Sequence, residues 1–469
     1  MQRKKFLRLA LLAPGALLAR TPAGLLFENN SGFLHPATEY FLPGSETYEK
    51  LRGGFNKRIS KKPSAIARCK NTEDVAEAVR YAMSKKWAVT VRSGGHCMEG
   101  FSAADGAMMI HLGQLNSTEW IDNNTIRVGP ACTLSKLYDV LLPKKKIIPG
   151  GSCAGVGIGG LTLGGGYGLL ARKFGLTCDS LLGLTMVDGR GRVVDASTDK
   201  NLLWACRGGN NGNFGVVTSL TFRVHDAPAT MQSFRFRSFQ VDRVRAMRIM
   251  NNWFELTRNL PPDCFGAFVL NKSTLYILLT SVRKDTSAIE PVIAALARLS
   301  DKTTRSAAVS LAQALKNYYG VQEPLYFKNA SAGLYRNFAS IEPYIGSVLD
   351  KVIATPGMIF QINTLGGNIQ SADKENGSAF PHREYPYFSE LQTYWDNPSR
   401  EVALLRRFQE VQEIFARNGM NVQYRNYPDI NFVSPATDYY GKNLTRLQQI
   451  KKQYDPDNIF RYEQSIPAL

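Results

Sequence analysis

Residues 149–176, PGGSCAGVGIGGLTLGGGYGLLARKFGL, contain eleven glycines in 28 positions, and this stretch decides the fold. Glycine clustered in a sequence that is not of low complexity indicates that the backbone approaches another group closely. A second glycine loop, VRSGGHCMEGFS (91–102), directly follows a predicted strand. Successive backbone N–H groups in such loops form concave anion sites that suit a pyrophosphate. Both loops are therefore candidates for ligand binding.

Three glycines of the longer loop, Gly155, Gly157 and Gly160, match the G-x-G-x-x-G fingerprint of dinucleotide-binding proteins. That fingerprint has to follow a strand and open a helix. Here it follows PGGSCA and leads into LTLGGGYG, which is a poor helix former. The pattern therefore argues against a Rossmann site, and Walker A, HExxH and GxSxG strings are absent from the sequence.

A histidine and a cysteine lie inside these loops, His96 in the first and Cys153 in the second. The pattern alone leaves two interpretations open for His96 and for Cys153. Each is a structural residue, or it takes part in binding a metal or a covalent cofactor. No third or fourth zinc ligand is recognisable among the other histidines, so no metal site is predicted. The seven cysteines form no CxxC pair, which excludes a zinc ribbon or thioredoxin site and leaves at least one thiol free or otherwise occupied.

Composition narrows the class of protein. A chain of 469 residues predicts two or three domains, and 44% hydrophobic with 20% charged residues is typical of globular proteins. The net charge of +18 allows a polyanionic partner, but the basic residues are spread along the chain and no nucleic-acid-binding motif accompanies them. We therefore expect a solvated basic surface and no nucleic-acid binding.

The amino terminus has the layout of a signal peptide over residues 1–23, with basic residues, an apolar stretch and then small residues. Its RKKFLR string is similar to the twin-arginine pattern, with Lys4 in place of the second arginine. The alternative is an amphipathic amino-terminal arm. No other segment reaches about 18 uninterrupted apolar residues, so we expect an exported, periplasmic or secreted protein without stable membrane insertion.

Hydrophobic periodicity predicts mixed α/β structure. Helices are expected at 73–86, 133–144 and 445–460, strands at 88–92, 215–224 and 421–429, and a hairpin at 181–197. After residue 225 strands alternate with longer helices.

Several motifs in order resemble one known family. SGGH ending at His96, GGSCAGVGIGG around Cys153, LLWACRGGNNGNFGVVTSLTFRV (202–224) and YRNYPD (424–429) are similar to the berberine-bridge-enzyme-like oxidases of the vanillyl-alcohol-oxidase, or PCMH-type, flavoprotein superfamily. The similarity runs from about residue 43 to residue 466. It implies an α+β fold, in which a PCMH-type FAD-binding domain of two α/β subdomains (24–225) accompanies an inserted substrate domain (226–424). The inserted domain would be an antiparallel sheet covered by helices, and a carboxy-terminal element (425–469) would return to the FAD domain.

The resemblance also implies the cofactor, an FAD attached at two points through His96 and Cys153. The residues that it places around the flavin are Arg92, Ser93, Gly94, Gly95, Gly155, Val156, Gly157, Gly159, Gly160 and Val217.

A base has to accept the proton of an alcohol as its hydride leaves, and the family motif assigns this role to Tyr427. A tyrosine pKa near 10 would have to be lowered by a positive charge or a hydrogen bond. In a regular strand Asp429 would share the face of Tyr427, although a structural role is favoured for Asp429. Tyr424, Gln361 and Asn363 are candidates for the substrate pocket, whereas His382 and Arg383 are interpreted as structural.

The resemblance implies three functions to be separated: an oxidase that uses O2, a dehydrogenase that uses another acceptor, and a catalytically silent secreted flavoprotein. Val156 occupies the family's oxygen-gate position and favours the oxidase. The substrate is expected to be a small alcohol, either C1 of a mono- or oligosaccharide or a hydroxyl of a secondary metabolite. We expect a monomer.

Overall fold

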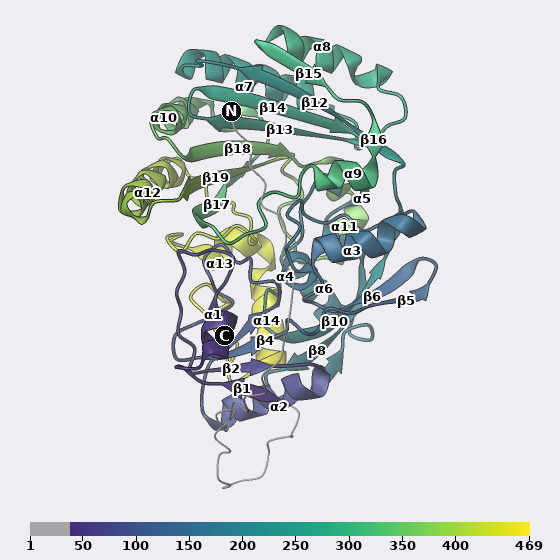
Figure 1. The fold of residues 1–469 in the computed structure, drawn as a ribbon, viewed down its shortest axis with the longest axis vertical. Coiled ribbons are helices and arrows are strands. Elements are labelled where there is room, and N and C mark those ends of the chain that lie inside the picture. Colours follow the sequence, from purple (N-terminus) through teal and green to yellow (C-terminus); the bar gives the residue numbers. More distant parts are fainter. Residues whose placement is uncertain (1–37) are drawn as a thin grey trace, which may run out of the picture. The chain divides into compact units, whose positions relative to one another are not determined.

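The first glycine loop connects two strands of a four-stranded sheet near the start of the described chain (Figure 1). The structure is a computed structural model that describes residues 38–469; the predicted signal peptide, 1–23, lies outside the described residues. The strand order is β1 (Glu39–Phe41), β2 (Ala65–Arg68), β4 (Met108–His111), β3 (Val89–Arg92), with β4 parallel to both β2 and β3. The helices of this part are α1 (Glu46–Arg52) and α2 (Thr72–Ser84).

The second glycine loop packs beside a five-stranded antiparallel sheet. Its strand order is β5 (Thr118–Asp122), β6 (Thr125–Val128), β10 (Gly215–Arg223), β8 (Leu181–Asp188), β9 (Val193–Asp195). β8 and β9 are the predicted hairpin, and the strand at 215–224 is confirmed as β10. The accompanying helices are α3 (Leu134–Leu141), α4 (Ile158–Leu163), α5 (Ala171–Phe174) and α6 (Lys200–Cys206), and β7 (Lys146–Ile147) pairs with β11 (His225–Asp226).

The middle of the chain forms an eight-stranded antiparallel sheet, labelled in the upper part of Figure 1. The order is β15 (Lys302–Arg305), β12 (Thr230–Ser238), β14 (Thr274–Ser281), β13 (Cys264–Asn271), β18 (Met358–Thr364), β19 (Tyr387–Trp395), β17 (Tyr326–Tyr335), with β16 (Val309–Ser310) beside β12. Helices α7 (Arg243–Thr257), α8 (Glu290–Arg298), α10 (Glu342–Ile353) and α12 (Glu401–Arg417) bury one face of this sheet; α9 (Leu311–Lys316) and α11 (Ala372–Gly377) lie in its connections. The predicted α+β fold with a helix-covered antiparallel sheet is confirmed.

Side chains along these strands alternate between the two faces of the sheet, and this alternation positions the site. On β18, Phe360 and Ile362 point into the helix-covered core, whereas Gln361 and Asn363 face the opposite side. Because successive side chains alternate between the two faces of a sheet, one face of the large sheet is apolar and the other is free to line a cavity.

The carboxy-terminal segment returns to the first two sheets through α13 (Pro435–Tyr440) and α14 (Leu444–Tyr454). Val89 N–H donates to Ile459 O at 2.7 Å, and Gly189 N–H donates to Tyr454 O at 2.8 Å. The strand expected at 421–429 is wrong, since this stretch forms no strand and the chain turns at Arg425 and Asn426. Tyr427 N–H donates back to Tyr424 O at 3.0 Å, and Pro428 has no amide hydrogen to give to a ladder.

Residues 38–469 contain no helix long and apolar enough to cross a bilayer. Residues 38–469 lie within one compact unit, so the domain limits at residues 225 and 424 stay predictions.

Candidate active site

A cavity of about 1090 Å³ lies between the two glycine loops and the polar face of the eight-stranded sheet. Residues predicted from the sequence line this cavity on the two glycine loops and on the sheet. They are Ser93, Gly94, Gly95, His96, Cys153, Val156, Gly157, Gly159, Gly160, Val217, Gln361, Asn363, Tyr424 and Tyr427.

The two glycine loops touch backbone to backbone. A Cβ built at Gly94 would lie 2.3 Å from the amide nitrogen of Gly157, and one at Gly157 would lie 2.7 Å from that of Gly94. Ser93 Oγ donates to Pro130 O at 2.5 Å and fastens the first loop. Only glycine at both positions allows the loops to form a shared floor for the cavity.

His96 is held rigidly at this floor. Its ring stacks on Phe55 with centroids 4.3 Å apart, and its Nδ1–H donates to Gly94 O at 3.1 Å. Gly155 lies beside it, since a Cβ there would be 3.2 Å from His96 Cε1. Burial lowers the pKa of His96, so the imidazole is neutral at physiological pH and keeps a lone pair on one nitrogen.

Cys153 faces the cavity and is the exposed member of the seven free cysteines; the other six are buried or half-buried. Desolvation by the cavity wall raises the pKa of its thiol, and the negative charge of Glu390 raises it further. Ala154 N–H donates to Tyr319 O at 3.3 Å, which brings the 318–321 segment against this loop. The exposed Cys153 thiol therefore opens onto the same cavity as His96, and the half-buried Cys97 also lines it.

Arg92 does not line the cavity. Its Nη1 donates to Leu51 O at 2.7 Å and to Gly53 O at 2.6 Å, so the side chain secures the end of α1 beneath the first glycine loop. The G-x-G-x-x-G segment also differs from expectation, because Ile158–Leu163 forms a short helix, α4, with Gly157 as its N-cap residue.

Five buried polar atoms in the cavity wall have no hydrogen-bond partner among residues 38–469: Thr90 Oγ1, Tyr167 OH, Asn211 Oδ1, Asn329 Oδ1 and Trp395 Nε1. Buried polar atoms in folded proteins nearly always have a partner. Gly160 leaves open space, with no atom within 4 Å of a built Cβ. Glycine-lined space and unpaired polar atoms fit a large polar cofactor such as FAD between the loops.

Tyr427 and Tyr424 belong to one aromatic cluster. Tyr427 stacks on Phe388 at 5.4 Å with an interplanar angle of 6°, and its ring centroid is 5.4 Å from that of Tyr424. The Tyr424 hydroxyl accepts from Gly166 N–H at 3.0 Å and Tyr167 N–H at 3.3 Å, and so holds the glycine loop. Burial raises the pKa of Tyr427 well above 10, and Glu390 raises it further. The groups that act on Tyr427 most strongly thus oppose the lowered pKa that the sequence led us to expect.

Glu390 on β19 is a cavity residue that sequence reasoning missed. Asn329 Nδ2 donates to its Oε2 at 3.1 Å, and Asn363 Nδ2 donates to its Oε1 at 3.3 Å. Gln361 Nε2 donates in turn to Asn363 Oδ1 at 2.8 Å, which extends the polar row across the sheet. Burial raises the pKa of Glu390. In YFSELQTYW a single acid in an alternating strand reads as a solvent-facing position, so the sequence carried only a weak signal.

Contacts inside the fold hold Asp429, His382 and Arg383, and their structural role stays a prediction. Asp429 accepts from Lys328 Nζ at 2.7 Å and from Asn431 N–H at 3.0 Å. Arg383 Nη2 donates to Asp179 Oδ1 at 2.5 Å, and His382 is buried with its pKa lowered to about 4. None of the three lines the cavity.

Comparisons with known proteins agree with this geometry. A family model described as FAD binding domain matches residues 63–197, and one described as berberine and berberine-like matches residues 423–467. An uncharacterised FAD-linked oxidoreductase of Bacillus subtilis is 30% identical over 448 residues, which cover 90% of this chain and 96% of the relative. Chitooligosaccharide oxidase of Gibberella zeae is 26% identical over 90% of this chain and 91% of its own.

The fold is also similar to a solved structure, the berberine-bridge-enzyme-like protein 1 of Physcomitrella patens. The TM-score is 0.82 at 26% identity, with 92% of this chain and 97% of that chain covered.

Proposed function

Because the chain belongs to the berberine-bridge-enzyme-like FAD-linked oxidoreductases, we propose that it is an oxidase of small alcohols. It removes a hydride and a proton from CH–OH and passes two electrons to O2, so that the alcohol and O2 become a carbonyl compound and H2O2. The observation that carries this proposal is the continuous cavity, which joins both glycine loops to the polar face of the eight-stranded sheet.

FAD bound between the loops would supply the hydride acceptor. His96 and Cys153 are its proposed points of attachment. Two observations support them: the His96 imidazole is neutral and held in place, and the Cys153 thiol opens onto the cavity. The glycine contacts at Gly94 and Gly157 keep side chains out of the space that the cofactor needs.

The proton of the alcohol has two candidate acceptors in the cavity. Tyr427 is the proposed base, and its stacking on Phe388 fixes the ring beside the glycine loop. Glu390 is the second candidate, and its buried carboxyl favours it, because a raised carboxyl pKa brings a base toward the working pH of an enzyme. Replacing each residue separately distinguishes the two.

The polar row on the sheet supports a saccharide as the substrate. Gln361, Asn363 and Asn329 alternate hydrogen-bond donors and acceptors along one wall, as sugar hydroxyls require. Tyr394, stacked on Phe327 at 5.9 Å, adds an aromatic surface to the same cavity. We propose that the enzyme oxidises C1 of a mono- or oligosaccharide, and a hydroxyl of a secondary metabolite is the alternative substrate. We also propose that the protein is exported and acts as a monomer.

Val156 supports O2 as the electron acceptor. This half-buried residue lines the cavity beside Cys153, and its N–H donates to Cys153 O at 3.3 Å. A short side chain here leaves room for O2 in a close-packed wall. A dehydrogenase with another acceptor is the second candidate, and a silent flavoprotein is the third.

The test is a panel of mono- and oligosaccharides and aromatic alcohols, given to the purified holoprotein while peroxide and flavin bleaching are recorded. Peroxide release with a sugar supports the oxidase. Bleaching without reoxidation in air identifies a dehydrogenase, and no bleaching with any alcohol leaves the silent flavoprotein.

A further inference from the structure

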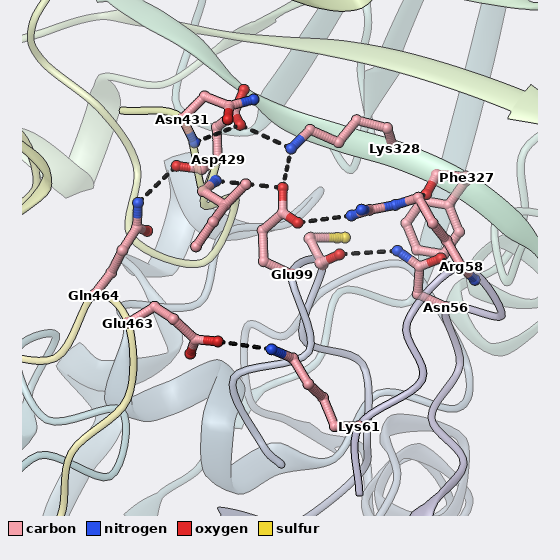
Figure 2. Close-up of polar contacts among 12 residues, drawn as sticks. Asn56, Arg58, Lys61, Glu99, Phe327, Lys328, Asp429, Asn431, Glu463 and Gln464 are labelled. Carbon is pink, nitrogen blue, oxygen red and sulfur yellow. Dashed lines mark hydrogen bonds and ion pairs between the residues drawn. The ribbon is translucent and has the colours of Figure 1, made fainter. Parts of the chain in front are cut away.

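Three charged side chains form a buried cluster behind the cavity wall (Figure 2). Lys328 Nζ contacts Glu99 Oε1 and lies 2.7 Å from Asp429 Oδ1, and the three side chains are only 4%, 3% and 1% exposed. Arg58 Nη2 completes the cluster at 2.6 Å from Glu99 Oε2. None of the four residues lines the cavity, so the proposed reaction does not use them directly.

The cluster joins three segments that carry the proposed chemistry. Glu99 is three residues after His96, and Asp429 is two residues after Tyr427. Lys328 lies on β17 between two cavity residues on the other face of the strand, Phe327 and Asn329.

The neighbours of Lys328 reach both halves of the site. Phe327 contacts Phe55 with centroids 6.0 Å apart, and Phe55 stacks on His96. On the other side, Asn329 donates to Glu390. Any displacement of β17 would therefore move residues that contact the glycine loop of His96 and the polar row of Asn329 and Glu390.

Further contacts fix the geometry of the two carboxylates. Ile430 N–H donates to Glu99 Oε1 at 3.4 Å, and Gln412 Nε2 donates to Asp429 Oδ2 at 3.3 Å. Two cations balance two carboxylates, so the cluster is satisfied only when these three segments and Arg58 are all in place. Removing one member of such a buried group leaves an uncompensated charge, and buried ionic groups in some proteins specify register rather than add stability.

We propose that Lys328 is a positioning residue: with Glu99 and Asp429 it holds the His96 loop and the Tyr427 loop in one register against β17. This inference rests on the proposed function, because the register matters only if His96 carries the flavin and Tyr427 faces the substrate. A displacement of about 1 Å at such a site costs on the order of 100-fold in rate.

The test compares Lys328→Met with Lys451→Met, a matched control at a buried lysine outside the cavity wall. Lys451 Nζ contacts Asp455 Oδ2 at 2.7 Å and Phe460 O at 2.7 Å, and both side chains of this pair are 0% exposed. Both variants should lose thermal stability. Lys328→Met should also lower kcat about 10- to 100-fold and the fraction of flavin attached at His96, and Lys328→Arg should restore much of both.

The control separates positioning from simple destabilisation. Lys451→Met should keep the wild-type kcat and flavin attachment at temperatures below its unfolding transition. Equal attachment and equal kcat in the two Met variants would overturn the inference. If Lys328→Met does not fold, the isosteric Glu99→Gln is measured by the same two readouts and has to show the same selective loss. Wild-type protein without attached flavin would contradict the proposed function instead.

Discussion

Gly94→Ala places a methyl group where the two glycine loops meet. The new Cβ would lie 2.3 Å from Gly157 N and 2.8 Å from Gly157 Cα, both of them backbone atoms. Ordinary contact begins near 3.4 Å, so the loops have to separate by about 1 Å in a close-packed region. Overpacking of this kind costs about 1–3 kcal/mol of stability, and a displacement of about 1 Å costs on the order of 100-fold in rate.

The assay measures attached flavin per polypeptide after denaturation, together with kcat and the melting temperature. Gly377→Ala is the control, because its Cβ would meet only Arg207 Nη1 at 3.7 Å, outside the main cavity. Gly94→Ala should lose flavin attachment and turnover, whereas the control keeps both. Wild-type flavin content and kcat in Gly94→Ala would refute the idea that the contact between the loops shapes the cofactor site.

Three further substitutions separate the roles in the cavity. Tyr427→Phe should keep its flavin and lose about 10²–10⁴ in turnover if Tyr427 is the base; near wild-type kinetics would transfer the role to Glu390. Glu390→Gln should abolish the acid limb of the kcat/KM profile if that limb reports the Glu390 carboxyl. Burial raises the Glu390 pKa above its ordinary 4.5. The stability of the wild type therefore falls as the pH rises from 4.5 through the raised pKa. The Glu390→Gln variant should have a higher melting temperature than the wild type at neutral pH, but not at about pH 4. Val156→Ile should slow reoxidation by air but spare reduction by substrate in stopped-flow measurements, and equal reoxidation rates would count against the gate.

The fold was predictable because its evidence is local and repeated. A DG turn between alternating strands predicts the hairpin at 181–197. Alternating β-branched residues predict the strand at 215–224. The segment around Tyr427 was predicted as a strand because its apolar and polar residues also alternate. Pro428 and the turn from Tyr424 to Tyr427 decide otherwise, and that turn is sustained by long-range contacts such as Ser331 N–H to Tyr427 O at 2.8 Å.

The residues of the candidate site could be predicted where a local motif marks them. His96 and Cys153 are each marked by surrounding glycines, whereas Glu390 and Lys328 sit in strands whose alternation does not reveal which face is buried. The roles proposed for Glu390 and Lys328 depend on hydrogen-bond partners that lie between 27 and 229 residues away in the sequence. Arg92 shows the reverse case, since a residue inside a cofactor motif turns its guanidinium to the end of α1.

The most direct test of the account is mass analysis of tryptic peptides from the acid-denatured holoprotein. Cleavage at arginine and lysine places His96 in peptide 93–127 and Cys153 in peptide 147–172. The account predicts one flavin that joins these two peptides, and a flavin on peptide 93–127 alone after Cys153→Ala. Free FAD in the acid supernatant, with both peptides unmodified, would contradict it.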